Sequence, residues 1–311
     1  MPMTDPSHAA AITLLDGGMG KALQEVGAPF RQPEWSALAL IESPEWVERV
    51  HQQFVDAGAD VVITNNYAVV PFHLGDRADD LLEELTDLAG RLARSVADRA
   101  EQHVRVAGSI PPLFGSYEPD KFDPDRAPAL LERITDSLVS HVDLFVAETQ
   151  SSIAEACASF AAAARHGLPI WVSATLEDGG GPSGVEAHID SPQLRSGESV
   201  ASFATAMADL GVEAVLFNCS QPEMMASAIA AARSVVPATV QVGAYANAFE
   251  DRPEGEHYAA NEHVMTHRGD LEDGGYTSFV RDWLNAGATI VGGCCGIMPR
   301  HVAQLRAELD T

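Results

Sequence analysis

Two adjacent cysteines, Cys294 and Cys295, follow a run of strand-forming residues in the stretch TIVGGCCGIMP (289–299), with glycine on both sides. A disulfide between them would be strained, because consecutive Cα atoms are about 3.8 Å apart whereas a relaxed bridge needs roughly 4.4 to 6.8 Å. The chain has two further cysteines, Cys157 and Cys219. A vicinal pair with a third thiol available is therefore more typical of metal ligands or reactive thiolates than of a structural clamp.

The first ten residues, MPMTDPSHAA, lack the basic region and the long apolar core of a secretory signal. No apolar run in the sequence approaches the ~20 residues that a membrane-spanning helix needs. We therefore expect a soluble protein in the reducing cytoplasm, with its thiols free.

The composition is strongly acidic. The chain has 45 Asp and Glu against 17 arginines and two lysines, Lys21 and Lys121, and its formal net charge is -26. A field of this sign repels nucleic acid and anionic lipid, so we expect neither nucleic acid nor a membrane as a partner. We interpret the acidic composition as favouring solubility and assign it no role in catalysis.

Eight short β-branched runs alternate with longer helix-like segments. The runs are ITLLDGG (12–18), DVVITNN (60–66), VRVAGSI (104–110), LFVAET (144–149), IWVSATL (170–176), AVLFNCS (214–220), VQVGAYA (240–246) and TIVGGCC (289–295). The helix-like segments include 44–58, 79–102, 153–167, 199–211, 223–235 and 276–287, several of them ended by a glycine suited to a helix C-cap. Runs that are apolar on both faces and separated by helices indicate a parallel sheet. Eight of them, with no linker rich in Pro, Gly and Ser, predict a single (β/α)8 TIM barrel domain over residues 1–311.

Polar residues stand where each predicted strand ends, which is where catalytic residues lie in a barrel of this kind. These residues are Asp16, Asn65, Asn66, Ser109, Glu148, Thr175, Asn218, Cys219, Tyr245, Asn247, Cys294 and Cys295. Some polar strand ends serve only to satisfy turns. Three cysteines on one rim are harder to explain in that way.

The three rim cysteines can meet if the loops lean inward. Cys219 lies near the end of the sixth run, whereas Cys294 and Cys295 end the eighth, and strand ends two apart are roughly 9 Å from each other. Two thiolates, each about 2.3 Å from a shared zinc, can nearly span that gap once the length of their own side chains is added. Gly293 and Gly296 leave room above such a metal. The result would be a zinc site with three cysteine ligands and one open position, as in catalytic sites, although spacing alone leaves other thiol chemistry open.

Motifs along nearly the whole chain resemble the zinc-dependent homocysteine S-methyltransferases. The matching strings are LLDGGMG, WSALALIESPEWVERVHQQFVDAGADVVITNNY, VAGSI, VAET, FNCS and IVGGCCGIMPRHV. The resemblance implies an enzyme that transfers a methyl group to the thiolate of homocysteine and so forms methionine. It also implies that Cys219, Cys294 and Cys295 bind Zn²⁺. Cys157 matches no ligand and is expected to be a small buried residue.

The same resemblance assigns the substrate pocket. Asp16 and Glu148 match acids that hold the amino group of homocysteine in the family. The amides of Gly17, Gly18 and Gly293 are assigned to its carboxylate. Two strand-end amides, Asn65 and Asn218, complete the predicted substrate-binding set.

The methyl donor is expected to be a sulfonium compound. The stretch WSALALIESPEW and the chain length resemble the bacterial and plant members that use S-methylmethionine, whereas betaine-using members carry a long C-terminal arm. In those members, the string that follows the second strand resembles T-x-x-Y-Q. The string here is TNNYAVV, with Ala68 in place of the glutamine. We expect this change to remove a polar group near the donor pocket. A betaine- or corrinoid-dependent enzyme is the alternative within the family.

Two further features are open to more than one interpretation. Trp35, Tyr67, Phe114 and Tyr117 open loops, where they could form a cage for a methylated cation or simply pack at the rim. The segment EHYAANEHVMTHRGD (256–270) contains His257, and His263 and His267 at i, i+4 spacing. Because it lacks the Glu of H-E-x-x-H, we expect a loop over the active site and no second metal.

Two other function classes fit a thiol-bearing barrel. A zinc hydrolase would use histidine and carboxylate ligands, but no H-x-H stands at a predicted strand end. A non-catalytic thiol- or zinc-binding barrel is the second. The expected partners are small molecules, namely homocysteine and a methyl donor. Assembly of the chain into a homo-oligomer is a further possibility.

Overall fold

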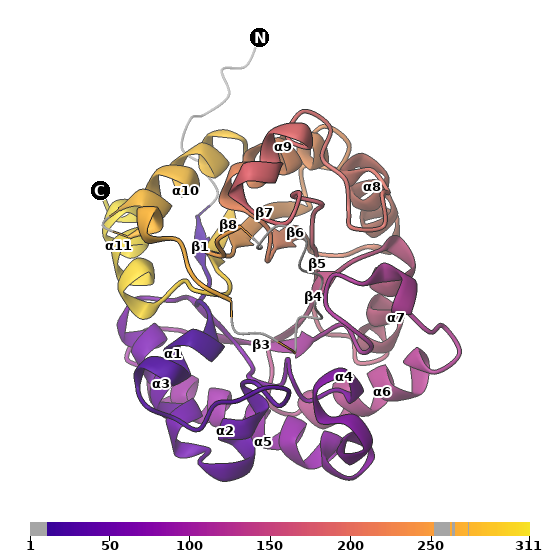
Figure 1. The fold of residues 1–311 in the computed structure, drawn as a ribbon, viewed down its shortest axis with the longest axis vertical. Coiled ribbons are helices and arrows are strands. Elements are labelled where there is room, and N and C mark those ends of the chain that lie inside the picture. The colour runs from indigo at the N-terminus through magenta and orange to yellow at the C-terminus, as the bar shows by residue number, and fades with distance from the viewer. Residues whose placement is uncertain (1–10, 252–261, 263–264, 273) are drawn as a thin grey trace.

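Eight parallel strands form a nearly closed barrel in the computed structural model, which describes residues 11–251, 262, 265–272 and 274–311 (Figure 1). The strands are β1 (Thr13–Leu14), β2 (Val61–Ile63), β3 (Arg105–Ile110), β4 (Leu144–Gln150), β5 (Ile170–Ala174), β6 (Ala214–Asn218), β7 (Gln241–Ala246) and β8 (Ile290–Gly293). Each lies within or nearly coincides with one of the eight predicted runs. The predicted (β/α)8 TIM barrel is confirmed.

The barrel closes between its first two strands. The strand order is β1-β8-β7-β6-β5-β4-β3-β2, and a single parallel bridge between Leu15 and Val61 joins β1 to β2. The amide of Asp16 donates to the carbonyl of Val61 at 3.0 Å. Asp16 is therefore held at the seam of the barrel, at the C-terminal end of β1.

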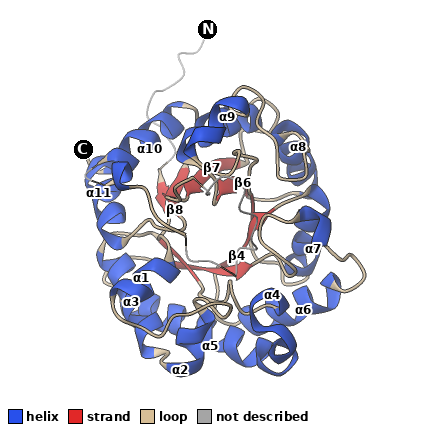
Figure 2. Cartoon of the chain, viewed as in Figure 1, coloured by secondary structure: helices blue, strands red, loops and turns tan. Residues whose placement is uncertain are grey.

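The helices surround the strands (Figure 2). They are α1 (Met19–Glu25), α2 (Ala37–Glu42), α3 (Glu45–Asp56), α4 (Pro71–Leu74), α5 (Ala78–Arg99), α6 (Ala127–Leu138), α7 (Ile153–Ala164), α8 (Val200–Leu210), α9 (Pro222–Arg233), α10 (Gly275–Asn285) and α11 (Pro299–Leu309). The six helical segments named from the sequence are confirmed. Helix α8 ends at Gly211, whose φ of 85° is the left-handed conformation expected of a glycine C-cap.

The strand residues alternate between two apolar cores. In β6, Ala214 and Leu216 belong to a cluster inside the barrel, whereas Val215 and Phe217 pack into the larger core between strands and helices. Both faces of each strand are thus buried, which explains why the strands appear as continuous apolar runs in the sequence. The same alternation turns the side chain of Asn218 toward the barrel interior.

No helix in the described part of the chain combines the length and the apolar character that a membrane crossing requires.

Candidate active site

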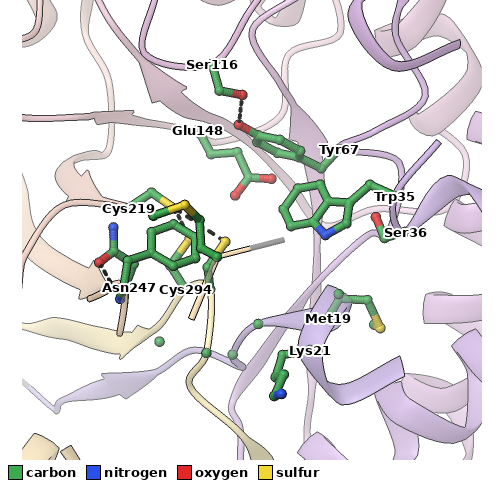
Figure 3. A pocket seen from close by; sticks show the side chains of 18 of the residues that line it. Met19, Lys21, Trp35, Ser36, Tyr67, Ser116, Glu148, Cys219, Asn247 and Cys294 are labelled. Carbon is green, nitrogen blue, oxygen red and sulfur yellow. Dashed lines mark hydrogen bonds between the residues drawn. The ribbon is translucent and has the colours of Figure 1, made fainter. Parts of the chain in front are cut away.

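One pocket lies at the C-terminal ends of the strands, and most of the predicted site residues line it (Figure 3). These residues are Asp16, Gly17, Gly18, Asn65, Glu148, Cys219, Gly293, Cys294 and Cys295. They come from the C-terminal parts of β4 and β8 and from the loops after β1, β2, β6 and β8, so the predicted convergence on one rim is present. Asn218 is the one predicted site residue that is not part of the pocket wall.

The sulfur atoms of Cys219, Cys294 and Cys295 form one group, within 4.8 Å of one another. The Sγ of Cys219 lies 2.8 Å from that of Cys294 and 3.6 Å from that of Cys295. Tetrahedral ligands about 2.3 Å from a zinc ion would be about 3.8 Å apart, so a small outward movement of Cys294 accommodates the ion. Cys157 lies on α7, partly buried, and is not a member of the group.

Glycines allow the turn that carries the cysteine pair to pack tightly. A Cβ on Gly293 would lie 2.2 Å from Cγ2 of Ile297, and Gly296 has a φ of +84°, a conformation that other residues seldom adopt. The amide of Cys294 donates to the carbonyl of Ala246 at 2.8 Å, which fastens the turn to the end of β7. The turn is therefore fixed to the strand that separates the two sets of cysteines.

Left-handed backbone conformations are concentrated at this site. Four non-glycine residues in the described chain have a positive φ, and they are Trp35 (47°), Tyr117 (69°), Thr149 (58°) and Cys219 (50°). Three of them line the pocket, and Thr149 directly follows Glu148. Such conformations cost free energy for residues with a Cβ, and they persist where surrounding contacts impose a particular geometry.

Two buried acids face the same pocket, and neither forms an ion pair with a cation of the described chain. Asp16 Oδ2 accepts a hydrogen bond from the amide of Ile63 at 2.9 Å, and Glu148 accepts one from the hydroxyl of Ser109. Burial raises the pKa of Asp16 well above its ordinary value, and the nearby charge of Glu148 adds to the effect. Burial also raises the pKa of Glu148 to about 7, opposed by the Ser109 hydrogen bond. An ammonium group bound between these acids would favour their ionised forms.

Within the described residues, no arginine neutralises Glu148. None of the ion pairs formed in the described chain involves Glu148 or Asp16, and neither pKa is influenced by a neighbouring cation. The acids are instead oriented by the uncharged donors of Ile63 and Ser109. The charge of this pair is left for a ligand.

The glycine amides assigned to a carboxylate are not equally free. The amide of Gly18 donates to the carbonyl of Ile297 at 2.7 Å, and that of Gly293 donates to the carbonyl of Asp16 at 2.9 Å. The amide of Gly17 has no such backbone acceptor within the described residues. A Cβ at Gly17 would also lie 2.3 Å from the carbonyl oxygen of Ile297, so only glycine fits there. Of the three predicted amides, Gly17 alone is therefore available to a carboxylate.

The two predicted asparagines have different surroundings. Asn65 is on the pocket wall, and its Nδ2 donates to the carbonyl of Ser36 at 3.3 Å. The Oδ1 of Asn218 accepts from Thr149 N at 2.8 Å and from Ser173 Oγ at 2.7 Å. Its Nδ2 donates to Thr149 Oγ1 at 2.8 Å and lies 3.9 Å from the sulfur of Cys294. Asn218 thus ties β4, β5 and β6 together behind the cysteines, rather than facing a substrate.

If the three cysteines bind a metal as predicted, Asn218→Ala should weaken its binding while leaving the KM of the predicted substrate unchanged. The substitution leaves the buried Thr149 and Ser173 without their partner, and changes behind a metal ligand typically cost about 10- to 100-fold in metal affinity or activity. Competition with a chromogenic chelator measures the affinity. Asn66→Ala is the matched control, because Asn66 is equally buried but bonds Thr64 and Ser109. A raised KM at unchanged metal affinity would show instead that Asn218 binds the substrate, as the sequence predicted.

Aromatic residues form another wall of the pocket. Trp35 and Tyr67 meet edge to face, with ring centroids 5.7 Å apart and planes at 84°, and the Tyr67 hydroxyl is hydrogen-bonded to Ser116 Oγ at 2.7 Å. Figure 3 shows this pair beside Glu148. Tyr117 also lines the pocket, but Phe114 does not and instead packs beneath the guanidinium of Arg126. Three of the four aromatic residues considered for a cation cage are therefore at the site.

Several pocket residues were not identified from the sequence. Arg195 pairs with the buried Asp178 at 2.8 Å, and its Cζ lies 5.2 Å above the ring centre of Tyr117. His73 stacks on Trp35 with ring centroids 5.8 Å apart. An ion pair between residues that both follow β5 carries no motif, and nothing in the sequence distinguished it from surface charges.

Two sequence expectations about the surrounding loops have different outcomes. Ala68 is fully buried in the outer core and does not itself line the pocket, although its neighbour Tyr67 does. The expectation that alanine here removes a polar group near the donor pocket stays a prediction. His267 does line the pocket, as expected for a loop over the site. His257 and His263 lie outside the described residues, so the prediction made for them stays a prediction.

Comparisons with known proteins all point to one family. The family model described as homocysteine S-methyltransferase matches residues 13–309. The chain is 28% identical to the homocysteine S-methyltransferase of Escherichia coli (strain K12), over 96% of this chain and 95% of that protein. It is 25% identical to homocysteine S-methyltransferase 3 of Zea mays and to the selenocysteine methyltransferase of Astragalus bisulcatus, over 96% of this chain and 90% and 92% of those proteins.

A solved structure shares the fold. The homocysteine methyltransferase MmuM from Escherichia coli, in its metallated form, aligns with a TM-score of 0.76 at 24% sequence identity. The alignment covers 96% of this chain and 97% of that one.

Proposed function

The chain belongs to the homocysteine S-methyltransferase family, which makes it an enzyme that methylates homocysteine, and from this premise we propose that zinc and a sulfonium methyl donor serve its reaction. We assign the metal to Cys219, Cys294 and Cys295 and the amino group of homocysteine to Asp16 and Glu148. The residue roles below belong to the same proposal.

The observation that carries the proposal is the convergence of two complementary features in one pocket. Three thiol sulfurs lie within 4.8 Å of one another, and two buried acids without a protein cation line the same pocket. Homocysteine has a thiol at one end and an ammonium group at the other. The three cysteines would bind the thiol through a shared metal ion. The two acids would bind the ammonium group through charge-assisted hydrogen bonds.

The donor set supports zinc as the metal. Soft thiolate ligands favour zinc over the hard cations Mg²⁺ and Ca²⁺, and three protein ligands leave the open position that distinguishes catalytic zinc sites. When bound, zinc would keep the homocysteine sulfur in its thiolate form at neutral pH, where a free thiol with a pKa near 8.5 is mostly protonated.

The residues of the chain would then position both reactants. Asp16 and Glu148 hold the substrate ammonium, and the free amide of Gly17 reaches its carboxylate. The faces of Trp35 and Tyr67 attract the positive sulfonium of the donor. Orienting two reactants in this way can lower a barrier by several kcal/mol.

The chemical step is a displacement at the methyl carbon. A lone pair of the homocysteine sulfur forms the new carbon–sulfur bond, while the bond from the methyl group to the sulfonium breaks with its electron pair staying on the donor sulfur. The donor leaves as a neutral thioether, and no proton has to move at the carbon. Because positive charge disappears in this step, a pocket with apolar aromatic walls favours it.

The other function classes are less well supported. The metal-ligand group found in the described chain consists of cysteines alone, whereas a zinc hydrolase would use histidine and carboxylate. A non-catalytic thiol-binding barrel does not account for two buried acids that lack a cation. Betaine- and corrinoid-dependent transfer remain the alternatives for the donor.

We also propose that the enzyme acts in a reducing cytoplasm on small molecules, without nucleic acid. Free thiols support the first part, and the net charge of -26 supports the second.

Among donors, S-methylmethionine should give the highest kcat/KM, with S-adenosylmethionine weaker and glycine betaine poor. The experiment offers each donor to purified enzyme with zinc and homocysteine and measures methionine. The physical reason is that the aromatic wall accepts a compact sulfonium, whereas a methyl on quaternary nitrogen has a poorer leaving group. A highest kcat/KM with betaine would contradict the sulfonium assignment, and hydrolysis without methionine would support the hydrolase.

A further inference from the structure

Lys21 is a cation on the pocket wall that has no ion-pair partner among the described residues, although the chain has 45 acids. The other pocket cation, Arg195, is paired with Asp178 at 2.8 Å. The second lysine of the chain, Lys121, is paired with Glu118 at 2.8 Å.

The acid one helical turn from Lys21 is engaged elsewhere. Glu25 stands four residues after Lys21, the spacing at which opposite charges on a helix can pair. Its carboxylate instead lies 3.4 Å from a guanidinium nitrogen of Arg300. The ammonium of Lys21 is therefore left for a ligand.

The first turn of α1 places Lys21 beside the proposed donor wall. A Cβ on Gly20 would lie 2.9 Å from Nε1 of Trp35, so the helix backbone touches the indole. A Cβ on Gly18 would lie 2.6 Å from the carbonyl oxygen of Cys294, so the residues just before the helix touch the cysteine turn. Lys21 is thus next in sequence to the aromatic contact and about 4.5 Å along the helix axis from the cysteine contact.

The side chain of Lys21 lies apart from Glu148 in the pocket. Figure 3 shows Met19 and Lys21 below Trp35 in the view, with Glu148 and Ser116 at the far side. The charge of Lys21 also reaches His267, whose pKa is lowered chiefly by burial and next by Lys21. Gln24, three residues further on the same helix, lines the pocket as well. A cation and an amide therefore share one helix face.

This charge pattern fits a zwitterionic donor. Asp16 and Glu148 attract an ammonium group, and the adjacent Gly17 amide provides a carboxylate partner for the same substrate. Lys21 would repel that ammonium and has no role in holding it. A sulfonium donor with a carboxylate a few bonds from its sulfur could place its cation against Trp35 and its carboxylate at Lys21.

We propose that Lys21 binds the carboxylate of the methyl donor, so that the enzyme selects sulfonium compounds that carry an amino acid head group. Gln24 completes this head-group subsite by accepting from the donor ammonium. The inference rests on the proposed function, because it presupposes a sulfonium donor.

The test compares S-methylmethionine with its carboxamide, which keeps the sulfonium and the amino group but lacks the negative charge. Lys21→Met should lower kcat/KM for S-methylmethionine by roughly 10- to 100-fold, the loss expected for a hydrogen bond to a charged group. With the carboxamide as donor, Lys21→Met and the wild type should have the same kcat/KM. Lys21→Arg keeps the cation and should restore most of the activity, and Lys121→Met is the matched control with no expected effect.

Other outcomes overturn the inference. Equal losses with both donors would mean that Lys21 supports the structure, and unchanged kinetics would mean that it binds no ligand group. A raised homocysteine KM at an unchanged donor KM would assign it to the homocysteine carboxylate. Methionine formation by the wild-type enzyme tests the proposed function separately. If the wild type uses no sulfonium donor, both proposals fail, whereas an active wild type with an indifferent Lys21→Met variant overturns only this one.

Discussion

Cys295→Ala should lose its metal and, with it, more than about 100-fold of its turnover. Removing one of three thiolates leaves too few protein ligands to hold zinc. Even a change to a residue that only supports a metal ligand typically lowers metal affinity or activity about 10- to 100-fold. Elemental analysis of the purified variant measures zinc per chain, expected near one for the wild type and near zero for the variant. Cys219→Ala and Cys294→Ala should behave in the same way, since the three sulfurs form one group.

Cys157→Ala is the matched control for these variants. Cys157 is a free cysteine on α7 outside the metal-ligand group, so its replacement should change neither zinc content nor turnover. Full zinc content in the Cys295→Ala protein would remove Cys295 from the ligand set. Full zinc content in all three variants would contradict the metal site as a whole.

Glu148→Gln should lower kcat/KM for homocysteine by about 10- to 100-fold, mainly through KM, while zinc stays bound. The substitution keeps the shape of the side chain but removes a charge-assisted hydrogen bond, which is worth roughly 1.5 to 3 kcal/mol. Steady-state kinetics at saturating donor, together with zinc analysis, provide the measurement. The effect should fall mainly on homocysteine, because the proposal assigns Glu148 to the homocysteine ammonium and assigns the donor to other side chains.

Glu155→Gln is the control for a buried glutamate. Burial raises the pKa of Glu155 to about 7, as for Glu148, but its carboxylate accepts from the amide of Ser151 and does not line the pocket. This variant should show no change in homocysteine KM. An unchanged KM in Glu148→Gln, or a loss of folding without a kinetic effect, would instead make Glu148 a structural residue.

The barrel could be predicted from the sequence because its strands are buried on both faces. Runs such as AVLFNCS have no polar face, and the structure shows why, since Val215 and Leu216 enter different cores. The convergence of Cys219 with Cys294 and Cys295 followed from the same prediction. The ends of parallel strands meet at one rim, so residues 75 positions apart in sequence become neighbours.

Other features of the site depend on tertiary contacts that no local pattern encodes. The amides of Gly18 and Gly293 are occupied because β1, β8 and the turn before α11 pack in one register. Asn218 was placed in the substrate-binding set because it ends a strand, yet its four polar contacts all lie within the barrel. Lys21 could not be distinguished from a surface lysine until the structure placed it in the pocket lining, on a helix whose first residues pack against Trp35.

The most direct test of the account is zinc X-ray absorption on the purified enzyme with and without homocysteine. The account predicts three sulfur ligands at about 2.3 Å in the free enzyme, and a fourth sulfur at a similar distance once homocysteine is bound. A first shell made mainly of nitrogen and oxygen, or one that homocysteine leaves unchanged, would contradict the claim that the three cysteines hold the metal where the substrate thiol binds.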